Sequence, residues 1–163
     1  MSPTWSAKLL AFCLTFSSPI GVALTEAHSQ NAGDYLLYKS LLSARARLLS
    51  AAREGNDDKM STLFVQSMAE LHHYKTDNKI PEGVAISPCQ RAHEELAVSA
   101  SNLSVYVQPS RHISGPGDRD RDGRDADQWW SSHRETFEEC ERYLKIEATP
   151  RFGPERLTSV LPP

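Results

Sequence analysis

Cysteine is scarce in this 163-residue sequence and occurs only at positions 13, 89 and 140. No C-x-x-C-H motif is present, which excludes covalent haem attachment. The motifs G-x-S-x-G and H-E-x-x-H are also missing, so the local signatures of a serine hydrolase and a zinc protease are absent. We therefore expect a protein that is not an enzyme and carries no cofactor.

An excess of charge of either sign is missing as well. The chain has 18 Lys and Arg residues against 21 Asp and Glu residues, which gives a formal net charge of -3. Such a balance produces no positive field strong enough to attract a phosphate backbone. Nucleic acid is therefore excluded as an expected partner.

The N-terminal region lacks the roughly 20 uninterrupted apolar residues that a membrane-spanning helix needs. Lys8 precedes a mostly apolar run from Leu9 to Leu24, which Ser17-Ser18-Pro19 interrupts and small residues follow. A membrane anchor is the competing interpretation, but this order of features is typical of a cleaved export signal. We predict that residues 1–27 are a signal peptide and that the mature protein is periplasmic or secreted, with no stable membrane span.

Removal of that signal leaves one pair of cysteines, Cys89 and Cys140. Compartments outside the cytoplasm oxidise thiols, and two cysteines allow a single pairing. The sequence therefore predicts one disulfide between Cys89 and Cys140.

Apolar residues at alternating three- and four-residue steps predict four amphipathic helices, and no segment of useful length has the period of a strand. The first covers Asp34 to Arg53 and stops at Gly55; the second follows the cap at Asn56 and ends near Tyr74. A capping box at Ser87-Pro88-Cys89-Gln90 begins the third, which Pro109 ends, and the fourth runs from about Asp127 to Thr149. The predicted core stripes are Leu37, Leu41, Ala44, Leu48 and Ala52; Met60, Leu63, Phe64, Ser67 and Leu71; Cys89, Ala92, Leu96, Ala100, Leu103 and Val107; and Trp130, His133, Phe137, Cys140 and Leu144.

These elements predict an all-α fold, a small antiparallel four-helix bundle with up-down-up-down topology over residues 28–148. An antiparallel third and fourth helix would bring the two cysteines to the same end of the bundle. Residues 109–125 show no apolar periodicity and are expected to form a mobile loop. The proline-rich tail, residues 149–163, is expected to be disordered.

Few residues stand out as candidates for a site. Trp130 continues the core stripe, so its neighbour Trp129 is expected to be partly exposed and to offer an anchor for a partner, with Tyr106 at the same end of the bundle. Asp118, Asp120 and Asp122, followed by Gly123, resemble the first half of an EF-hand calcium loop, but Trp129 stands where the bidentate carboxylate is required. A solvated loop of self-paired charges is the preferred interpretation there.

His93 and His133 give the alternative of a metal site, because each shares a helix with one of the two cysteines. A disulfide would consume both sulfur ligands, so no metal site is preferred. The sequence therefore favours a non-catalytic interaction module of the cell envelope that binds another protein or an envelope component. The alternative is a metal- or small-ligand-binding bundle that uses His93 and His133.

Overall fold

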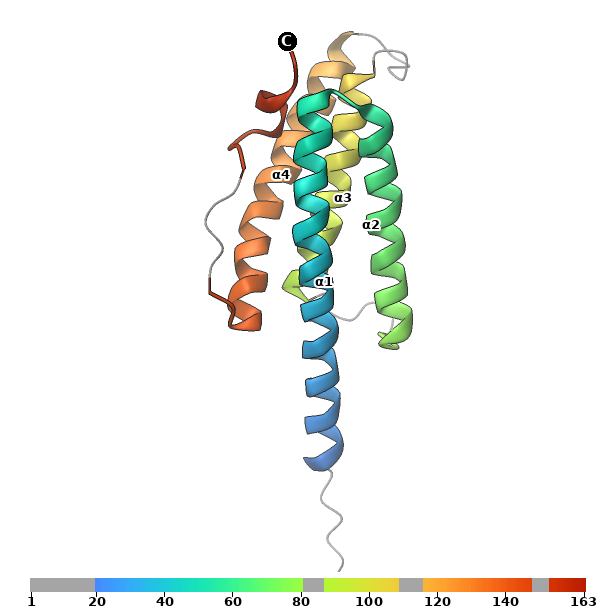
Figure 1. The fold of residues 1–163 in the computed structure, drawn as a ribbon, viewed down its shortest axis with the longest axis vertical. Coiled ribbons are helices and arrows are strands. Elements are labelled where there is room, and N and C mark those ends of the chain that lie inside the picture. Colours follow the sequence, from blue (N-terminus) through green and yellow to red (C-terminus); the bar gives the residue numbers. More distant parts are fainter. Residues whose placement is uncertain (1–19, 81–86, 109–115, 148–152) are drawn as a thin grey trace, which may run out of the picture.

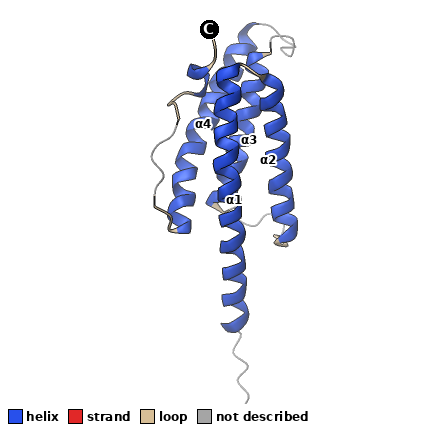
Figure 2. Cartoon of the chain, viewed as in Figure 1, coloured by secondary structure: helices blue, strands red, loops and turns tan. Residues whose placement is uncertain are grey.

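The structure is a computed structural model that describes residues 20–80, 87–108, 116–147 and 153–163, without the side chains of residues 20–31 and 116–118. It contains α1 (Ile20–Glu54), α2 (Asp57–Asp77), α3 (Pro88–Val107), α4 (Pro116–Leu144) and the short 3-10 helix η2 (Leu157–Val160). The described residues form helices, turns and loops but no strand (Figure 2). The all-helical fold with four helices is therefore confirmed (Figure 1).

The first helix begins earlier than the sequence predicted, at Ile20 rather than at Asp34. It is the longest helix and continues past the end of the bundle that the other three form (Figure 1). Residues 1–19, which hold most of the predicted signal peptide, lie outside the described residues. None of the described helices carries an apolar stretch long enough to span a bilayer.

Local chemistry fixes the turn between α1 and α2. Gly55 has a φ of 61°, and its N–H donates to the carbonyl of Ala52 while the N–H of Asn56 donates to that of Ala51. This pattern closes a helix with a residue in the left-handed region, which glycine adopts without strain. The side chain of Asn56 then accepts a hydrogen bond of 3.0 Å from the N–H of Lys59, so α2 begins where its cap was predicted.

The start of α3 also follows the sequence prediction. Ser87 accepts a 3.3 Å hydrogen bond from the N–H of Gln90, and Pro88 stands in the first turn, where its missing N–H is not needed. The helix ends at Val107, before Pro109.

Contacts between neighbouring helices step in opposite directions along the two partners: as the residue number rises on one helix, it falls on the next. The partners are Ser40 with Glu70 and Arg47 with Gln66 between α1 and α2, Ser61 with Ser104 and Glu70 with His93 between α2 and α3, and Arg91 with Glu139 and Glu95 with Ser132 between α3 and α4. The colours of Figure 1 follow the same reversals along the chain.

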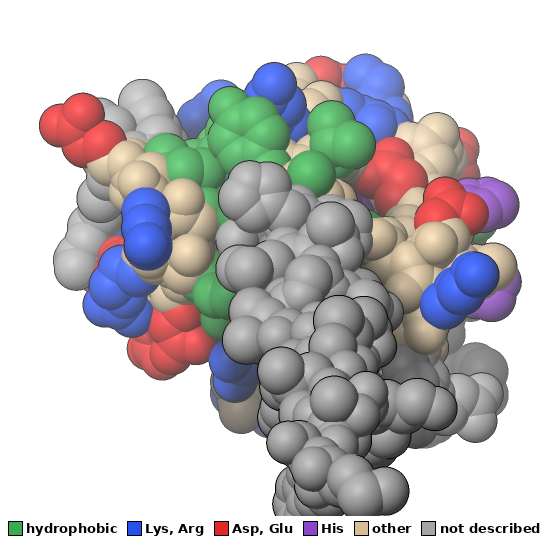
Figure 3. Space-filling model, turned by 90° about the horizontal axis from the view of Figure 1, so that it is seen from below, with side chains coloured by type: hydrophobic (Ala, Val, Ile, Leu, Met, Phe, Trp, Pro, Cys, Tyr) green, Lys and Arg blue, Asp and Glu red, His purple; other side chains and the backbone are tan. Residues whose placement is uncertain are grey.

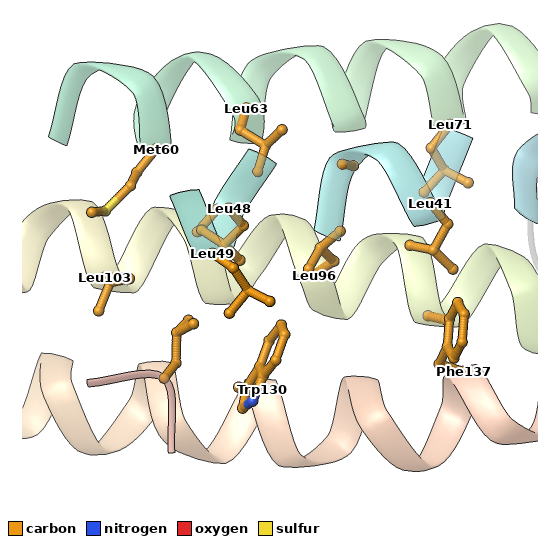
Figure 4. Close-up of a cluster of buried hydrophobic side chains, with 14 of the residues drawn as sticks. Leu41, Leu48, Leu49, Met60, Leu63, Leu71, Leu96, Leu103, Trp130 and Phe137 are labelled. Carbon is orange, nitrogen blue, oxygen red and sulfur yellow. The ribbon is translucent and has the colours of Figure 1, made fainter. Parts of the chain in front are cut away.

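The hydrophobic core lies along the axis of the bundle, and the predicted stripes supply most of it. Leu41, Leu48, Leu96 and Trp130 are completely buried, and Figure 4 shows them pointing toward one another from three helices. Of the predicted core positions, only Phe64, Val107 and Leu144 are no more than partly buried. Periodicity therefore identified the core correctly.

The disulfide between Cys89 and Cys140 is present, as predicted, and both residues are completely buried. It joins the first turn of α3 to the last turns of α4 across a Cα–Cα distance of 4.7 Å, closing a sequence separation of 51 residues. The bond therefore links two helices that already face each other.

The expected loop over residues 109–125 is wrong for its second half, because α4 begins at Pro116. Proline favours the first position of a helix, and Asp120 and Arg121 each have an opposite charge four residues later, in Arg124 and Asp125. The apolar period is missing because this part of α4 packs through Gly123, which lies against the ring of Tyr106. Residues 109–115 lie outside the described residues.

The expectation of a disordered tail is wrong for residues 153–163. Leu157 is completely buried, and η2 packs against both α1 and α4. Leu157, Val160 and Leu161 stand among prolines in a segment too short to show a helical period, which is why the sequence analysis missed their packing. Residues 148–152 of the predicted tail lie outside the described residues.

Candidate functional site

His133 on α4 lies in the centre of the bundle, between two aromatic rings. Its ring centroid is 5.4 Å from that of Trp130 and 5.9 Å from that of Phe137, and its Nδ1 is 2.9 Å from the carbonyl oxygen of Ala92 on α3. Its Nε2 is buried without a hydrogen-bond partner. Burial lowers the pKa of His133 to about 3, so the imidazole is neutral at neutral pH and Nδ1 carries the proton that Ala92 accepts.

His93 on α3 is completely buried on the side of the bundle that faces α2. Its Nε2 lies 3.4 Å from the carboxylate of Glu70. Burial lowers the pKa of His93, although the negative charge of Glu70 acts in the opposite direction. Cys89, one turn earlier on the same helix, is bound in the disulfide and offers no thiolate.

Arg45 of α1 is a buried cation that lies against the same two aromatic rings as His133. The guanidinium Cζ lies 5.4 Å from the ring centroid of Trp130 and 5.0 Å from that of Phe137, a cation–π arrangement with two rings of α4. Burial lowers the pKa of Arg45, and the nearby positive charge of Arg134 lowers it further, while Glu141 raises it. Glu141 is itself buried and accepts a 3.0 Å hydrogen bond from the hydroxyl of Tyr38.

The buried side chains of Arg45, His93, His133 and Glu141 include both histidines that the sequence offered for an interior site. Arg45 and Glu141 were not among its candidates. Each histidine packs against a different helix, His93 toward Glu70 of α2 and His133 toward Ala92 of α3. Over the residues that the structure describes, no three His, Cys, Asp or Glu side chains converge so as to hold a metal ion. His133 therefore packs beside the two rings that hold the guanidinium of Arg45, whereas His93 packs toward Glu70.

A second polar cluster lies near the disulfide and was missed by the sequence analysis. The buried carboxylate of Asp34 accepts hydrogen bonds from the hydroxyls of Tyr74, at 3.0 Å, and of Ser87, at 2.8 Å. Burial is the main cause that raises the pKa of Tyr74 to about 12, and Tyr143 faces the same carboxylate. Asp34 stood only at a predicted helix boundary, because a lone aspartate gives no sign of partners 40 and 53 residues away.

Trp129 and Trp130 are placed as the core stripe predicted. Trp130 is completely buried, whereas 40% of the Trp129 surface is exposed. Tyr106 is half-buried, and its ring lies beneath Arg119, whose Cζ is 5.1 Å from the ring centroid. Tyr106 therefore packs against the first turns of α4, through Arg119 and Gly123.

The aspartates of the suggested calcium loop belong to a helix. Residues 118, 120 and 122 stand at alternate positions of α4, and alternate positions on a helix point to opposite sides, about 200° apart. Asp120 is exposed and Asp122 is half-buried, while the side chain of residue 118 lies outside the described ones. The sharply turning loop that a calcium ion needs is replaced here by regular helix.

A surface hollow of about 420 Å³ lies between α1 and the start of α2. It is lined by Arg47, Ser50, Ala51, Asp58, Lys59 and Thr62. Its cations are already engaged, since Lys59 pairs with Glu54 and Arg47 donates to Gln66. Seen from the end where α1 continues past the bundle, the molecule shows charges of both signs around a small group of hydrophobic side chains (Figure 3).

Comparison of the chain with protein-family models, with curated proteins and with solved structures finds no match. The site is therefore interpreted from its own geometry.

Proposed function

We propose that this chain is exported and that its mature part is an antiparallel, up-down-up-down helical bundle that acts as a non-catalytic binding module of the cell envelope. Three observations support the compartment and topology: the disulfide, the opposite stepping of contacts between neighbouring helices, and the absence of a membrane-spanning stretch from the described helices. Disulfides persist in oxidising compartments such as the periplasm or the exterior.

The observation that carries the binding role is the exposure of Trp129 beside the buried Trp130. Tryptophan supplies a large, rigid contact area and is enriched among residues that dominate binding energy. Trp129 is 40% exposed on a regular helix, so a large part of its ring surface is open to a partner. The partner is another protein or an envelope component.

The export proposal is tested by mass spectrometry of the natively produced protein under non-reducing alkylation. We expect an N-terminus near residue 28 and no alkylated cysteine. An intact leader, or two alkylated sulfhydryls, would contradict it.

The binding proposal is tested by photo-crosslinking in the cells that export the protein. A photoreactive amino acid at Trp129 is expected to yield a reproducible crosslinked species. The same probe at Val65 on α2, which is 62% exposed, is the matched control and is expected to yield none. Equal crosslinking at both positions, or none at Trp129, would refute a role for this surface.

A second candidate, a metal- or small-ligand-binding interior, is favoured by one observation: the Nε2 atom of His133 is buried without a hydrogen-bond partner. Cobalt(II) titration separates the two functions. Saturable visible absorption that disappears in His133→Phe would favour the interior site, whereas identical featureless spectra of both chains would leave the binding module.

A further inference from the structure

The C-terminal segment, residues 153–163, lies on the bundle in the way that a bound peptide lies on its receptor. Leu157 is its anchor: the side chain is completely buried and belongs to the hydrophobic core. The short helix η2 that carries it contacts α1 and α4, whose own direct contacts are few (Figure 1). The segment therefore occupies a surface that two helices share.

One carboxylate of α4 accepts hydrogen bonds from three groups of the segment. Oδ1 of Asp127 accepts the N–H of Thr158 at 2.8 Å, and Oδ2 accepts the hydroxyl of Thr158 at 2.8 Å and Nε of Arg156 at 3.0 Å. Charge-assisted hydrogen bonds of this kind fix register as well as adding affinity. The surface therefore selects a segment with an arginine before a buried leucine and a threonine after it.

Contacts on either side extend this recognition. Trp130 donates its indole N–H to the carbonyl oxygen of Pro154 at 2.9 Å. Gly153, at a φ of 115°, approaches so closely that an added Cβ would lie 3.1 Å from the Trp130 ring and 3.5 Å from Leu49. At the other end Pro162 lies against Gly55, where an added Cβ would be 3.0 Å away. We call Leu49, Gly55, Asp127 and Trp130 the tail-docking surface.

We propose that the tail-docking surface is an interaction site for residues 153–163 of a second copy of this chain, which the chain's own tail occupies in the resting monomer. Every contact above joins the segment to the surface, so the same contacts form whichever copy donates the segment. A tethered segment has an effective concentration in the millimolar range, which keeps the intramolecular form dominant until it is weakened. This site is separate from Trp129 and stands whether or not Trp129 binds a partner.

Two complementary variants of the full chain test the proposal. Asp127→Ala keeps the tail but damages the surface, whereas Leu157→Asp keeps the surface but damages the tail. Each variant alone is expected to be a monomer whose Tm is lowered by about 5–10 °C. When mixed at about 100 μM they form one intact tail–surface pair, so we expect a heterodimer of twice the monomer mass in light scattering and a partial recovery of Tm.

The matched control mixes Asp127→Ala with the double variant Asp127→Ala/Leu157→Asp, which together contain no intact surface. This mixture is expected to remain monomeric. A monomeric Asp127→Ala and Leu157→Asp mixture, or equal dimer in the control, overturns the proposal.

If Leu157→Asp fails to fold, a milder variant, Leu157→Ala, takes its place, and binding of a labelled peptide is measured instead. A fluorescent peptide of residues 153–163 is expected to bind the Leu157→Ala variant at least tenfold more tightly than the double variant Asp127→Ala/Leu157→Ala. Equal anisotropy curves for the two chains overturn the proposal.

Discussion

The two faces of α4 are held in different ways. Toward α3 the contacts are a disulfide, a close helix approach at Gly123 and hydrogen bonds such as that of Ser132 to Glu95. Toward α1 the helices meet through long polar or aromatic side chains, chiefly Arg45, and through the C-terminal segment. The α3 face is therefore held by close contacts that recur along both helices. The α1 face is held by a few isolated contacts.

The largest expected effect concerns the α3 face. Replacing Cys89 and Cys140 by serine opens the loop of 51 residues, and the chain-entropy relation gives a loss of about 4 kcal/mol in the free energy of unfolding. Urea denaturation of the oxidised protein and of the double variant measures the difference. A double variant as stable as the oxidised protein would show that the disulfide does not stabilise the fold.

On the α1 face, Arg45→Met removes the cation that lies over two rings and near the buried Glu141. Removing one partner of a buried charged group leaves the other uncompensated, so we expect a loss of about 3 kcal/mol. The double variant Arg45→Met/Glu141→Gln is expected to recover part of this loss in the same urea experiment. A double variant that is less stable than Arg45→Met would contradict the interpretation.

The pH dependence of stability tests both faces of α4 together, because His133 lies where they meet. Its pKa of about 3 in the folded state is below the ordinary value of about 6.5, so below pH 6.5 the unfolded chain binds a proton that the folded chain refuses. Stability from this residue is therefore complete above pH 6.5 and falls by about 1.4 kcal/mol per unit as the pH decreases toward 3.

The test is the slope of unfolding free energy against pH between about pH 6 and pH 4. His133→Phe, which keeps an aromatic ring between Trp130 and Phe137, is expected to reduce the wild-type slope by about 1.4 kcal/mol per unit. His72→Phe changes an exposed histidine and is the matched control. An unchanged slope in His133→Phe would show that its pKa is not depressed.

The smallest effect is expected for the ion pair of Arg91 with Glu139 on the outer edge of the α3 face. The side chains are 3.1 Å apart but 51% and 45% exposed. Water and salt screen such pairs, so Arg91→Gln is expected to change stability by less than about 0.5 kcal/mol in thermal unfolding. A change comparable to that of Arg45→Met would erase the distinction between the surface and the interior of this protein.

Sequence periodicity was sufficient for the α3 face and insufficient for the α1 face. Cys89 and Leu96, and Trp130 and Cys140, stand at helical spacing and are all buried, so the pattern predicted the helices and their core face. The disulfide was predicted from the single remaining pair of cysteines. His133, a member of the predicted stripe, is buried, and Trp129, beside that stripe, is 40% exposed. The periodicity gave no prediction for the burial of His93.

The remaining contacts have no local pattern that a sequence reveals. Arg45 and Asp34 are polar positions on a predicted helix, and their partners on α2, α3 and α4 are set only by the folded chain. Leu157, Val160 and Leu161 lie in a short segment whose prolines favour an extended chain. Burial of such residues depends on tertiary packing, which propensity does not encode.

The disulfide also makes a covalent ring of all the residues between its two cysteines. A protease that cuts once anywhere inside that ring, between α3 and the last turns of α4, releases no fragment, because the sulfur bridge still joins both pieces. The nicked protein would migrate as one species on a non-reducing gel and separate into two only after thiol treatment. Damage within this third of the chain would therefore be invisible to any size assay that leaves the bridge intact.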